Sequence, residues 1–305
     1  MFYNCENLFD IRNDTLKDDE EFLPGGPRGW NASKYYRKIN SVAKVILSAG
    51  TWDPPALVGL CEVENEGVIQ DMLKSTPLNG HGYRIVYSNS HDARGIDVCL
   101  LYRESVVSII SSGSYYPVIT QNDSIFTGRP TLYVKLKIHD QVLNVMINHW
   151  PSRRGGVLNG QPLRTGLSER IVELADSIRA VEGVSAAFLI AGDFNCSPDD
   201  AEMRILERAG FMNLSASEAG RGNGTYRYRG VWYMFDQILI SEFATENQLP
   251  LSISDFSIHK PEILLMDDET WPGRKPFPTY NNYNYTGGFS DHLPVRAIIN
   301  FSQNH

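Results

Sequence analysis

Apolar and polar positions along the chain follow two periodicities, one typical of helices and one typical of strands. Between Lys34 and Ser48 the apolar residues recur at helical spacing, and Gly50 then supplies a stop. A second helix is predicted over Leu167–Val181, opening after Gly166. Short β-branched or continuously apolar runs predict the strands, which are Ala56–Val63, Ile96–Tyr102, Thr131–Ile138, Val142–His149, Ala187–Asp193, Phe235–Ser241, Ile253–Ile258 and Pro294–Phe301.

This succession of strands and helices predicts an α/β fold. Three long loops separate the elements, and loops of this length in a compact domain usually carry function: Asp14–Asn31, Trp150–Thr165 and Asp267–Ser290. His139-Asp140-Gln141 joins two strands at the spacing of a tight hairpin. The sequence contains no internal repeat, low-complexity tract or linker. We therefore expect a single domain over residues 1–305, built from two stacked sheets with outer helices.

Composition and charge narrow the class of protein. An apolar fraction of 42% in 305 residues excludes a wholly disordered chain, and no run approaches the roughly 18 apolar residues of a membrane span. The net charge, 28 − 36 = −8, argues against a basic nucleic-acid coat protein. It leaves room for an enzyme that meets phosphates in one local, metal-filled cleft. We expect a soluble, monomeric globular protein.

Cysteines and the start of the chain bear on the cellular compartment. The four cysteines form no CxxC pair and lie in or beside apolar runs, so they are expected to be buried free thiols: Cys5, Cys61, Cys99 and Cys196. The sequence opens directly in a strand pattern at Met1. Our hypothesis is that a further N-terminal segment, such as a signal peptide, belongs to the full-length product. The protein is then exported, and otherwise we expect it in the cytoplasm.

Chemically active polar residues close or precede five of the strands. They are Asn4 and Glu6, Glu62, His149, Asp193 and Asn195, and Ser290-Asp291-His292. Any one of them is more often a turn or capping residue than a catalyst. Their recurrence at five strand ends favours one shared cleft.

These residues lie in motifs that resemble those of the endonuclease/exonuclease/phosphatase superfamily, whose members include pancreatic deoxyribonuclease, abasic-site endonucleases, sphingomyelinases and inositol-polyphosphate phosphatases. The motifs follow the family's order over essentially the whole chain: Asn4-Cys5-Glu6-Asn7, Gly59-Leu60-Cys61-Glu62-Val63, Asn148-His149, Gly192-Asp193-Phe194-Asn195, Phe235-Asp236-Gln237-Ile238-Leu239 and Ser290-Asp291-His292. The chain also resembles uncharacterised bacterial members that begin Tyr-Asn-Cys-Glu-Asn-Leu-Phe-Asp. The resemblance implies a four-layer α/β sandwich, in which two mixed, mostly antiparallel β-sheets pack face to face between flanking helices.

The resemblance also implies a metal site. Glu62 would be the main ligand of a divalent ion, with Asn4, Glu6 and Asp291 as its partners. A hard cation bound by carboxylates and amides neutralises the charge that grows on a phosphoryl group. Oxygen ligands at few protein positions favour Mg²⁺, with Mn²⁺ as a substitute, because Mg²⁺ keeps several of its waters.

Five further residues take catalytic roles by resemblance. Asp193 would orient or deprotonate the attacking water, and Asn195 would hold a phosphate oxygen. His292 would contact the scissile phosphate while Asp236 orients the imidazole. His149 matches a histidine that binds phosphate or donates a proton in many members but is missing from the abasic-site nucleases. Which group is the general base stays open.

Three arginines near these motifs are candidate substrate contacts: Arg94, Arg153 and Arg154. Arginine binds phosphate oxygens in a bidentate manner, although exposed arginines are ordinarily solvated surface. The residues themselves do not decide between the two interpretations.

The sequence therefore predicts a metal-dependent phosphoesterase that hydrolyses its substrate by in-line attack of water. Basic residues are dispersed, so a small phosphoester is preferred to polymeric nucleic acid as the substrate. A nuclease acting on DNA or RNA is the alternative within the enzymes. A catalytically silent binding protein on the same fold is the alternative outside them, although every polar position that the family uses is present.

Overall fold

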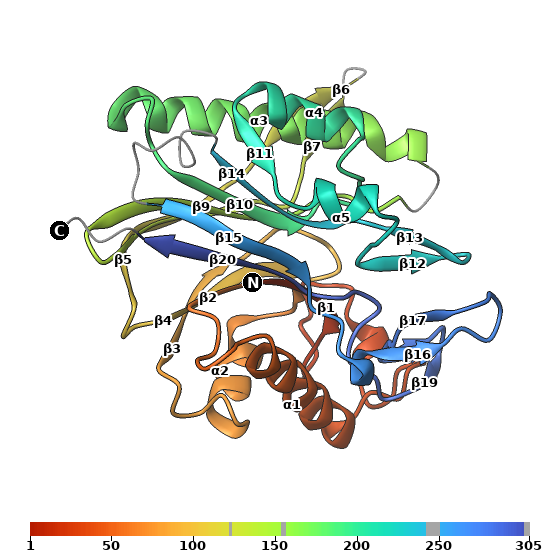
Figure 1. Cartoon of the computed structure of the whole chain (residues 1–305). Coiled ribbons are helices and arrows are strands. Elements are labelled where there is room, and N and C mark those ends of the chain that lie inside the picture. The colour runs from red at the N-terminus through yellow and green to blue at the C-terminus, as the bar shows by residue number, and fades with distance from the viewer. Residues whose placement is uncertain (122–123, 154–156, 242–250, 302–305) are drawn as a thin grey trace.

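Two β-sheets, each of six described strands, pack face to face at the centre of the molecule (Figure 1). The structure is a computed structural model and describes residues 1–121, 124–153, 157–241 and 251–301. The first sheet has the order β15 (Leu251–Ile258), β20 (Val295–Phe301), β1 (Phe2–Leu8), β2 (Leu57–Val63), β4 (Asp97–Arg103) and β3 (Tyr83–Ser88). The second has the order β11 (Phe211–Asn213), β14 (Asp236–Ser241), β10 (Phe188–Asp193), β9 (Gln141–His149), β8 (Thr131–Ile138) and β5 (Val107–Tyr115).

Each sheet has one parallel pair at its centre, and its other described neighbours are antiparallel. The pairs are β1 with β2 in the first sheet and β9 with β10 in the second. The carboxyl ends of a parallel pair meet at the same edge of a sheet. The antiparallel neighbours β14 and β20 bring their amino ends to that edge. One edge of the sandwich therefore collects the ends of six strands, and the predicted mixed, mostly antiparallel sheets are confirmed.

Helices cover both outer faces and complete four layers (Figure 1). Helix α1 (Ala32–Ser48) and helix α2 (Glu66–Ser75) lie on the first sheet, whereas α3 (Val157–Glu182) and α4 (Ala201–Arg208) lie over the second. The Asn31 side chain caps α1 by accepting the Lys34 N–H at 3.1 Å. The buried face of α1 contains apolar residues at helical spacing, namely Ile39, Val42, Ala43 and Ile46. The predicted four-layer sandwich is thus the observed fold.

Helix α3 begins at Val157, ten residues before the predicted start at Leu167. The segment predicted as the loop Trp150–Thr165 contains Gly160 and Pro162, which weaken a helix, and Gly166 follows it directly. The structure shows why Gly166 lies inside the helix. A Cβ atom at this position would stand 2.8 Å from the Cγ2 atom of Ile119, so only glycine permits the helix to pack this closely. Tertiary packing outweighs local helix propensity in this segment.

Short strands and helical turns lie outside the two sheets and the long helices. Four two-stranded hairpins are β6 (Val118–Gln121) with β7 (Ser124–Thr127), β12 (Tyr226–Tyr228) with β13 (Val231–Tyr233), β16 (Leu265–Asp267) with β17 (Arg274–Pro276), and β18 (Tyr280–Asn281) with β19 (Asn284–Tyr285). Helical turns lie at η1 (Glu20–Phe22), α5 (Ala216–Gly220) and η3 (Glu262–Leu264). The loop predicted over Asp267–Ser290 therefore contains several short strands. β12–β13 and β16–β17 extend from the same side of the sandwich (Figure 1).

The apolar core lies mainly between the sheets and beneath α1 and α2, and a second cluster lies between the second sheet and the helices α3 and α4. All four cysteines are buried and free, as the sequence predicts. No helix in the described ranges is long and apolar enough to cross a membrane.

Candidate active site

Three polar residues of the second sheet stand in one row across neighbouring strands. Asp193, the last residue of β10, is the register partner of His149 at the end of β9 and of Asp236 at the start of β14. Directly opposed residues in a sheet place their side chains on the same face. All three residues are buried. The strand ends of the second sheet thus place the carboxylate of Asp193 between the His149 imidazole and the Asp236 carboxylate.

The first sheet supplies Asn4 from β1 and Glu62 from β2. The pairing of β1 with β2 shifts register after Asn4, and the pairing of β2 with β4 shifts between Cys61 and Val63. Such bulges change the direction in which a side chain points. Glu6 and Glu62 have the left-handed φ angles of 51° and 58°, which cost a non-glycine residue about 1 kcal/mol or more. Backbone strain therefore occurs where the first sheet presents the carboxylates of Glu6 and Glu62.

The two sheets meet at the carboxylate of Asp193. Asn4 donates from Nδ2 to Asp193 Oδ2 at 3.0 Å across the sandwich. The Nε2 atoms of His149 and His292 both lie 3.9 Å from the same oxygen. His149 Nε2 is also 3.8 Å from Glu62 Oε1. Residues that are far apart in the sequence thus surround one acidic centre.

His292 and Asp236 form a buried pair. The two residues are 2.6 Å apart between His292 Nδ1 and Asp236 Oδ2. Burial alone would lower the pKa of His292, but the carboxylates of Asp236 and Asp193 outweigh it and hold this pKa well above its usual value. The pair therefore directs a positively charged Nε2–H towards Asp193 and the cavity.

His149 has the opposite electrostatic character. Burial lowers the pKa of His149 well below its usual value, and the charges of Arg129 and Arg94 lower it further. Burial raises the pKa of Asp193 to about 6, and the neighbouring Asp236 carboxylate acts in the same direction. The site thus combines a neutral imidazole, an imidazolium and a carboxyl group of raised pKa.

Asn195 and Arg153 form part of the rim. Asn195 donates from Nδ2 to the carbonyl of Trp150 at 3.0 Å, and its backbone N–H donates to Asp193 Oδ1 at 3.0 Å. Arg153 donates from Nε to the carbonyl of Asn195 at 2.8 Å, and its guanidinium lies 4.9 Å from the ring centre of Phe235. Arg153 thereby fixes the backbone of Asn195. Arg154 lies outside the described residues.

Glu62 and Asp291 have the properties of ligands for a divalent cation. Glu62 lines the cavity, and its Oε2 accepts the N–H of Asn7 at 2.9 Å, which fixes the carboxylate with Oε1 3.8 Å from His149 Nε2. Burial raises the pKa of Asp291 to about 7, and the carboxylates of Glu6 and Glu62 raise it as well. Among the described residues, no Lys or Arg lies within ion-pair distance of Glu62 or Asp291. This oxygen-donor pair therefore fits a hard cation, which would relieve the repulsion between the carboxylates.

Glu6 does not face the cavity, although the resemblance places it among the metal ligands. Its carboxylate accepts the N–H groups of Thr279 at 2.6 Å and Tyr280 at 3.3 Å. Lys38 Nζ lies 3.6 Å from it. The loop and α1 together hold the Glu6 carboxylate. We therefore leave Glu6 out of the proposed metal site and treat it as a residue that positions the loop.

Two compact groups of potential ligands also occur among the described residues: Cys61, His149 and Asp193, and Asp193, Asp236 and His292. Burial holds the pKa of the Cys61 thiol well above its usual value, so the thiol stays protonated and is a weak ligand. The second group already contains a short hydrogen-bonded ion pair. Glu62 and Asp291 therefore remain the better metal ligands.

A cavity of about 510 Å³ opens above these residues. Its lining contains eight residues that the sequence also predicts for the site, namely Glu62, Arg94, His149, Arg153, Asp193, Asn195, Asp291 and His292. It also contains residues that the sequence reasoning missed, including Arg129, Tyr226 and Tyr228. Arg129 donates from Nε to Asp92 Oδ2 at 2.9 Å and stands just before β8. Searching the amino ends of strands as well as the carboxyl ends would have found it.

Two stacked mixed sheets with this cluster of carboxylates and histidines at one edge define a hydrolase of the α/β-sandwich class. A family model described as the Endonuclease/Exonuclease/phosphatase family matches residues 1–300, and the chain belongs to this family. Its members hydrolyse phosphoester bonds, so the protein is a phosphoester hydrolase. A search of curated proteins finds no match to this chain.

Solved structures share the fold. The mannosyl-6-phosphatase of Bacteroides thetaiotaomicron superposes with a TM-score of 0.60 at 14% identity, over 94% of this chain and 97% of that one. The humanized TDP2 of D. rerio gives 0.61 at 18% identity, over 98% and 97%. The catalytic domain of human Nocturnin, solved with a bound sulfate anion, gives 0.58 at 14% identity, over 88% and 87%. At these identities the likeness concerns the fold alone.

Proposed function

We propose that the protein is a divalent-metal-dependent phosphoesterase that hydrolyses a compact phosphate ester. The observation that carries the proposal is the convergence of His149 and His292, from different sheets, on one oxygen of Asp193 beside Glu62. A phosphoryl group among these residues would meet a cation site and an imidazolium, which both oppose the charge that develops during hydrolysis.

The residues divide this work between them. Glu62 and Asp291, with the Asn4 amide beside them, would hold Mg²⁺ or Mn²⁺. The cation supplies charge neutralisation and polarises the phosphoryl oxygens when it is bound. His292, held by Asp236, would donate a hydrogen bond to a phosphate oxygen. Asp193 would orient the attacking water and accept its proton, while His149 and Asn195 would contact the remaining oxygens.

Metal removal tests the proposal directly. EDTA should abolish hydrolysis of small phosphate esters, and added Mg²⁺ or Mn²⁺ should restore it. Glu62→Gln should raise the Mg²⁺ concentration needed for half-maximal rate, because it removes one ligand charge and nearly preserves shape. The matched control is Glu66→Gln, the same change at an exposed position four residues later. Undiminished hydrolysis in EDTA would contradict the metal dependence.

A nuclease remains the second candidate, supported by the three arginines that line the cavity, Arg94, Arg129 and Arg153. Arginine is well suited to contacts with successive phosphates of a nucleic-acid strand. A substrate screen over plasmid DNA, single-stranded DNA, sugar phosphates, inositol phosphates and sphingomyelin decides between the candidates. Binding without turnover of any of them would instead favour a silent binding protein.

A further inference from the structure

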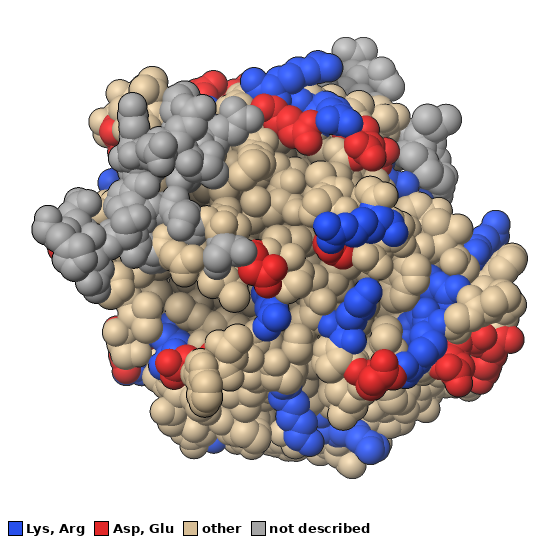
Figure 2. Space-filling model, viewed as in Figure 1, with Lys and Arg blue, Asp and Glu red and all other residues tan. Residues whose placement is uncertain are grey.

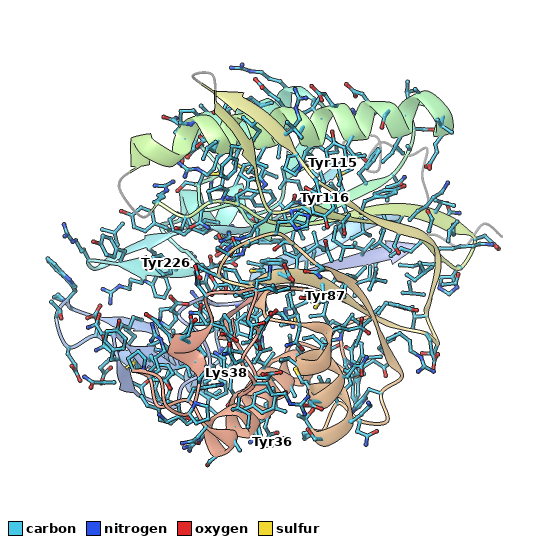
Figure 3. The ribbon with its side chains drawn as sticks, turned by 180° about the vertical axis from the view of Figure 1, so that it is seen from behind. Tyr36, Lys38, Tyr87, Tyr115, Tyr116 and Tyr226 are labelled. Carbon is cyan, nitrogen blue, oxygen red and sulfur yellow. The ribbon has the colours of Figure 1, made fainter. Side chains whose placement is uncertain are left out.

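Four aromatic residues line the cavity on the side of His292: Tyr226, Tyr228, Tyr233 and Phe235, here called the aromatic wall. Tyr226 and Tyr233 are direct partners in the β12–β13 hairpin. The Phe235 ring centre lies 5.4 Å from that of Tyr226, at 18°, and 5.3 Å from that of Tyr233, at 30°. The ring of Tyr226 lies 4.9 Å from the imidazole of His292. The wall is therefore continuous with His292 through Tyr226, which is labelled in Figure 3.

The hairpin that carries the wall is fixed in place. Arg229 and Gly230 form its turn with φ angles of 49° and 81°, and two positive φ angles match the twist of paired strands. Arg227 Nη1 is 3.0 Å from Asp268 Oδ2, and both side chains are less than a tenth exposed. Arg227 Nη2 also donates to the carbonyl of Pro272 at 2.6 Å. A wall held in this way is preorganised, so binding against it costs little ordering.

The packing of the core does not account for the whole wall. Phe235 is only 5% exposed and fills the interior, whereas Tyr228 is 50% exposed and lines the cavity. An aromatic ring that stays half in solvent at a cavity mouth contributes little to the core. It offers instead a broad apolar face for a ligand.

The cavity also carries positive charge close to His149. Arg94 and Arg129 line it next to His149, whose pKa they help to lower. A phosphate held between His149 and His292 would thus have the guanidinium groups of Arg94 and Arg129 near His149 and ring faces near His292. Arg153 packs on the wall itself, 4.9 Å from the ring centre of Phe235, and the wall offers apolar ring faces to the cavity.

We infer that the aromatic wall selects phosphate esters whose alcohol part is a ring, a sugar or a nucleoside, over esters of open-chain alcohols. The ring would lie against Tyr228 and Tyr233 while the phosphate occupies the catalytic residues. This inference rests on the proposed phosphoesterase function and adds the chemical class of its substrate.

The test compares kcat/KM in one Mg²⁺ buffer for glucose 6-phosphate, 5′-AMP and glycerol 3-phosphate. The first two esters separate a sugar from a nucleoside, and the third has no ring. The wild type should prefer at least one ring ester, and Tyr228→Ala should lower that preference about tenfold, in the range measured for loss of one ring stack. Tyr36→Ala is the matched control, since Tyr36 is 52% exposed but lies on α1, far from Tyr226 (Figure 3).

Tyr228→Phe separates ring stacking from hydrogen bonding. It keeps the ring, so it should retain the preference that Tyr228→Ala loses. An equal loss on ring and open-chain esters, or no ring preference in the wild type, would overturn the inference while leaving the phosphoesterase function intact.

Binding distinguishes the failure of the two proposals. If the wild type hydrolyses none of the three esters, the proposed function has failed on these substrates. Calorimetric titration of 5′-AMP and glycerol 3-phosphate then still tests the wall. Tighter binding of 5′-AMP that Tyr228→Ala weakens would support it, and equal binding of both esters would reject it.

Discussion

His292, just before β20, and Asp236, the first residue of β14, form a buried pair that we expect to act as one unit. Because Asp236 orients the imidazole at 2.6 Å, each single substitution to Ala should remove the same function. We expect kcat for a small phosphoester to fall by about 10²–10⁴ in either variant. The double variant should be little worse than the poorer single one. Full additivity of the two effects in log kcat would refute the pairing, and Asp255→Ala, at an exposed position, serves as control.

Individual residues also show how much of the site could be predicted from the sequence. Glu62, His149 and Asp193 were identifiable because strand patterns end at these residues, Glu62 in the first sheet and the other two in the second. The carboxyl ends of parallel strands share one edge of a sheet. The orientation of the Glu6 side chain could not be predicted from the sequence. It depends on a left-handed backbone angle and on a hydrogen bond from Thr279, which is 273 positions away. Local pattern contains no information about such a partner.

At the scale of elements, α1 holds the loop that leads to Asp291 and His292, two residues of the proposed site. Lys38, almost fully buried, donates from Nζ to Thr279 Oγ1 at 2.5 Å and to the carbonyl of Phe289 at 2.7 Å. Phe289 stands two residues before Asp291. Ser290 then donates from Oγ to the Asn4 carbonyl at 2.8 Å. The helix and β1 together fix the position of Asp291 and His292.

Lys38→Met should therefore affect both stability and catalysis. Removing one partner of a buried ion pair costs about 3 kcal/mol or more of unfolding free energy, which urea denaturation measures. The freed loop should also lower kcat. Lys44→Met, an exposed lysine on the same helix, is the control and should change neither quantity. A Lys38→Met protein with wild-type stability and kcat would show that the loop is held by other contacts.

The helices and strands were predicted correctly where the local sequence pattern determines them. The prediction failed where contacts with another element determine the structure. Strand β8 occurs at the predicted residues, Thr131–Ile138, because alternation and the following tight turn define it. The first turns of α3 were missed because a glycine usually marks the end of a helix. Gly166 instead lies inside α3, where it packs closely against Ile119 of β6. Only the folded neighbour explains why glycine is tolerated there.

The charge of the whole molecule bears on the choice between small esters and nucleic acid. On the face seen in Figure 2, Lys and Arg are interspersed with Asp and Glu, in keeping with the net charge of −8. We expect efficient turnover of a small ester with a weak dependence on salt. A nuclease that tracks duplex DNA loses affinity steeply, with a log–log slope of about −0.9 per neutralised phosphate. Efficient plasmid nicking with such a slope, and no turnover of small esters, would establish the nuclease alternative.

The buried thiols report on the integrity of the whole fold. Burial raises the pKa of Cys5 to about 12 and that of Cys61, Cys99 and Cys196 well above the usual value. The thiolate is the reactive form, so a thiol reagent at pH 8 should label the native protein very slowly. All four should react once urea unfolds it. Rapid labelling of any cysteine in the native protein would show that its strand opens locally.

The pairing of β1 with β20 has a consequence for folding during synthesis. Phe2 and Val295 are register partners, so the first and last strands of the described chain lie side by side in one sheet. A ribosome makes β1 long before β20. The edge of β1 that pairs with β20 therefore stays unpaired until β20 has been made. His292 is likewise synthesised after every other residue of the proposed site. The nascent polypeptide therefore stays without phosphoesterase activity until His292 has been made, and we expect catalytic competence to arise together with the pairing of β1 and β20.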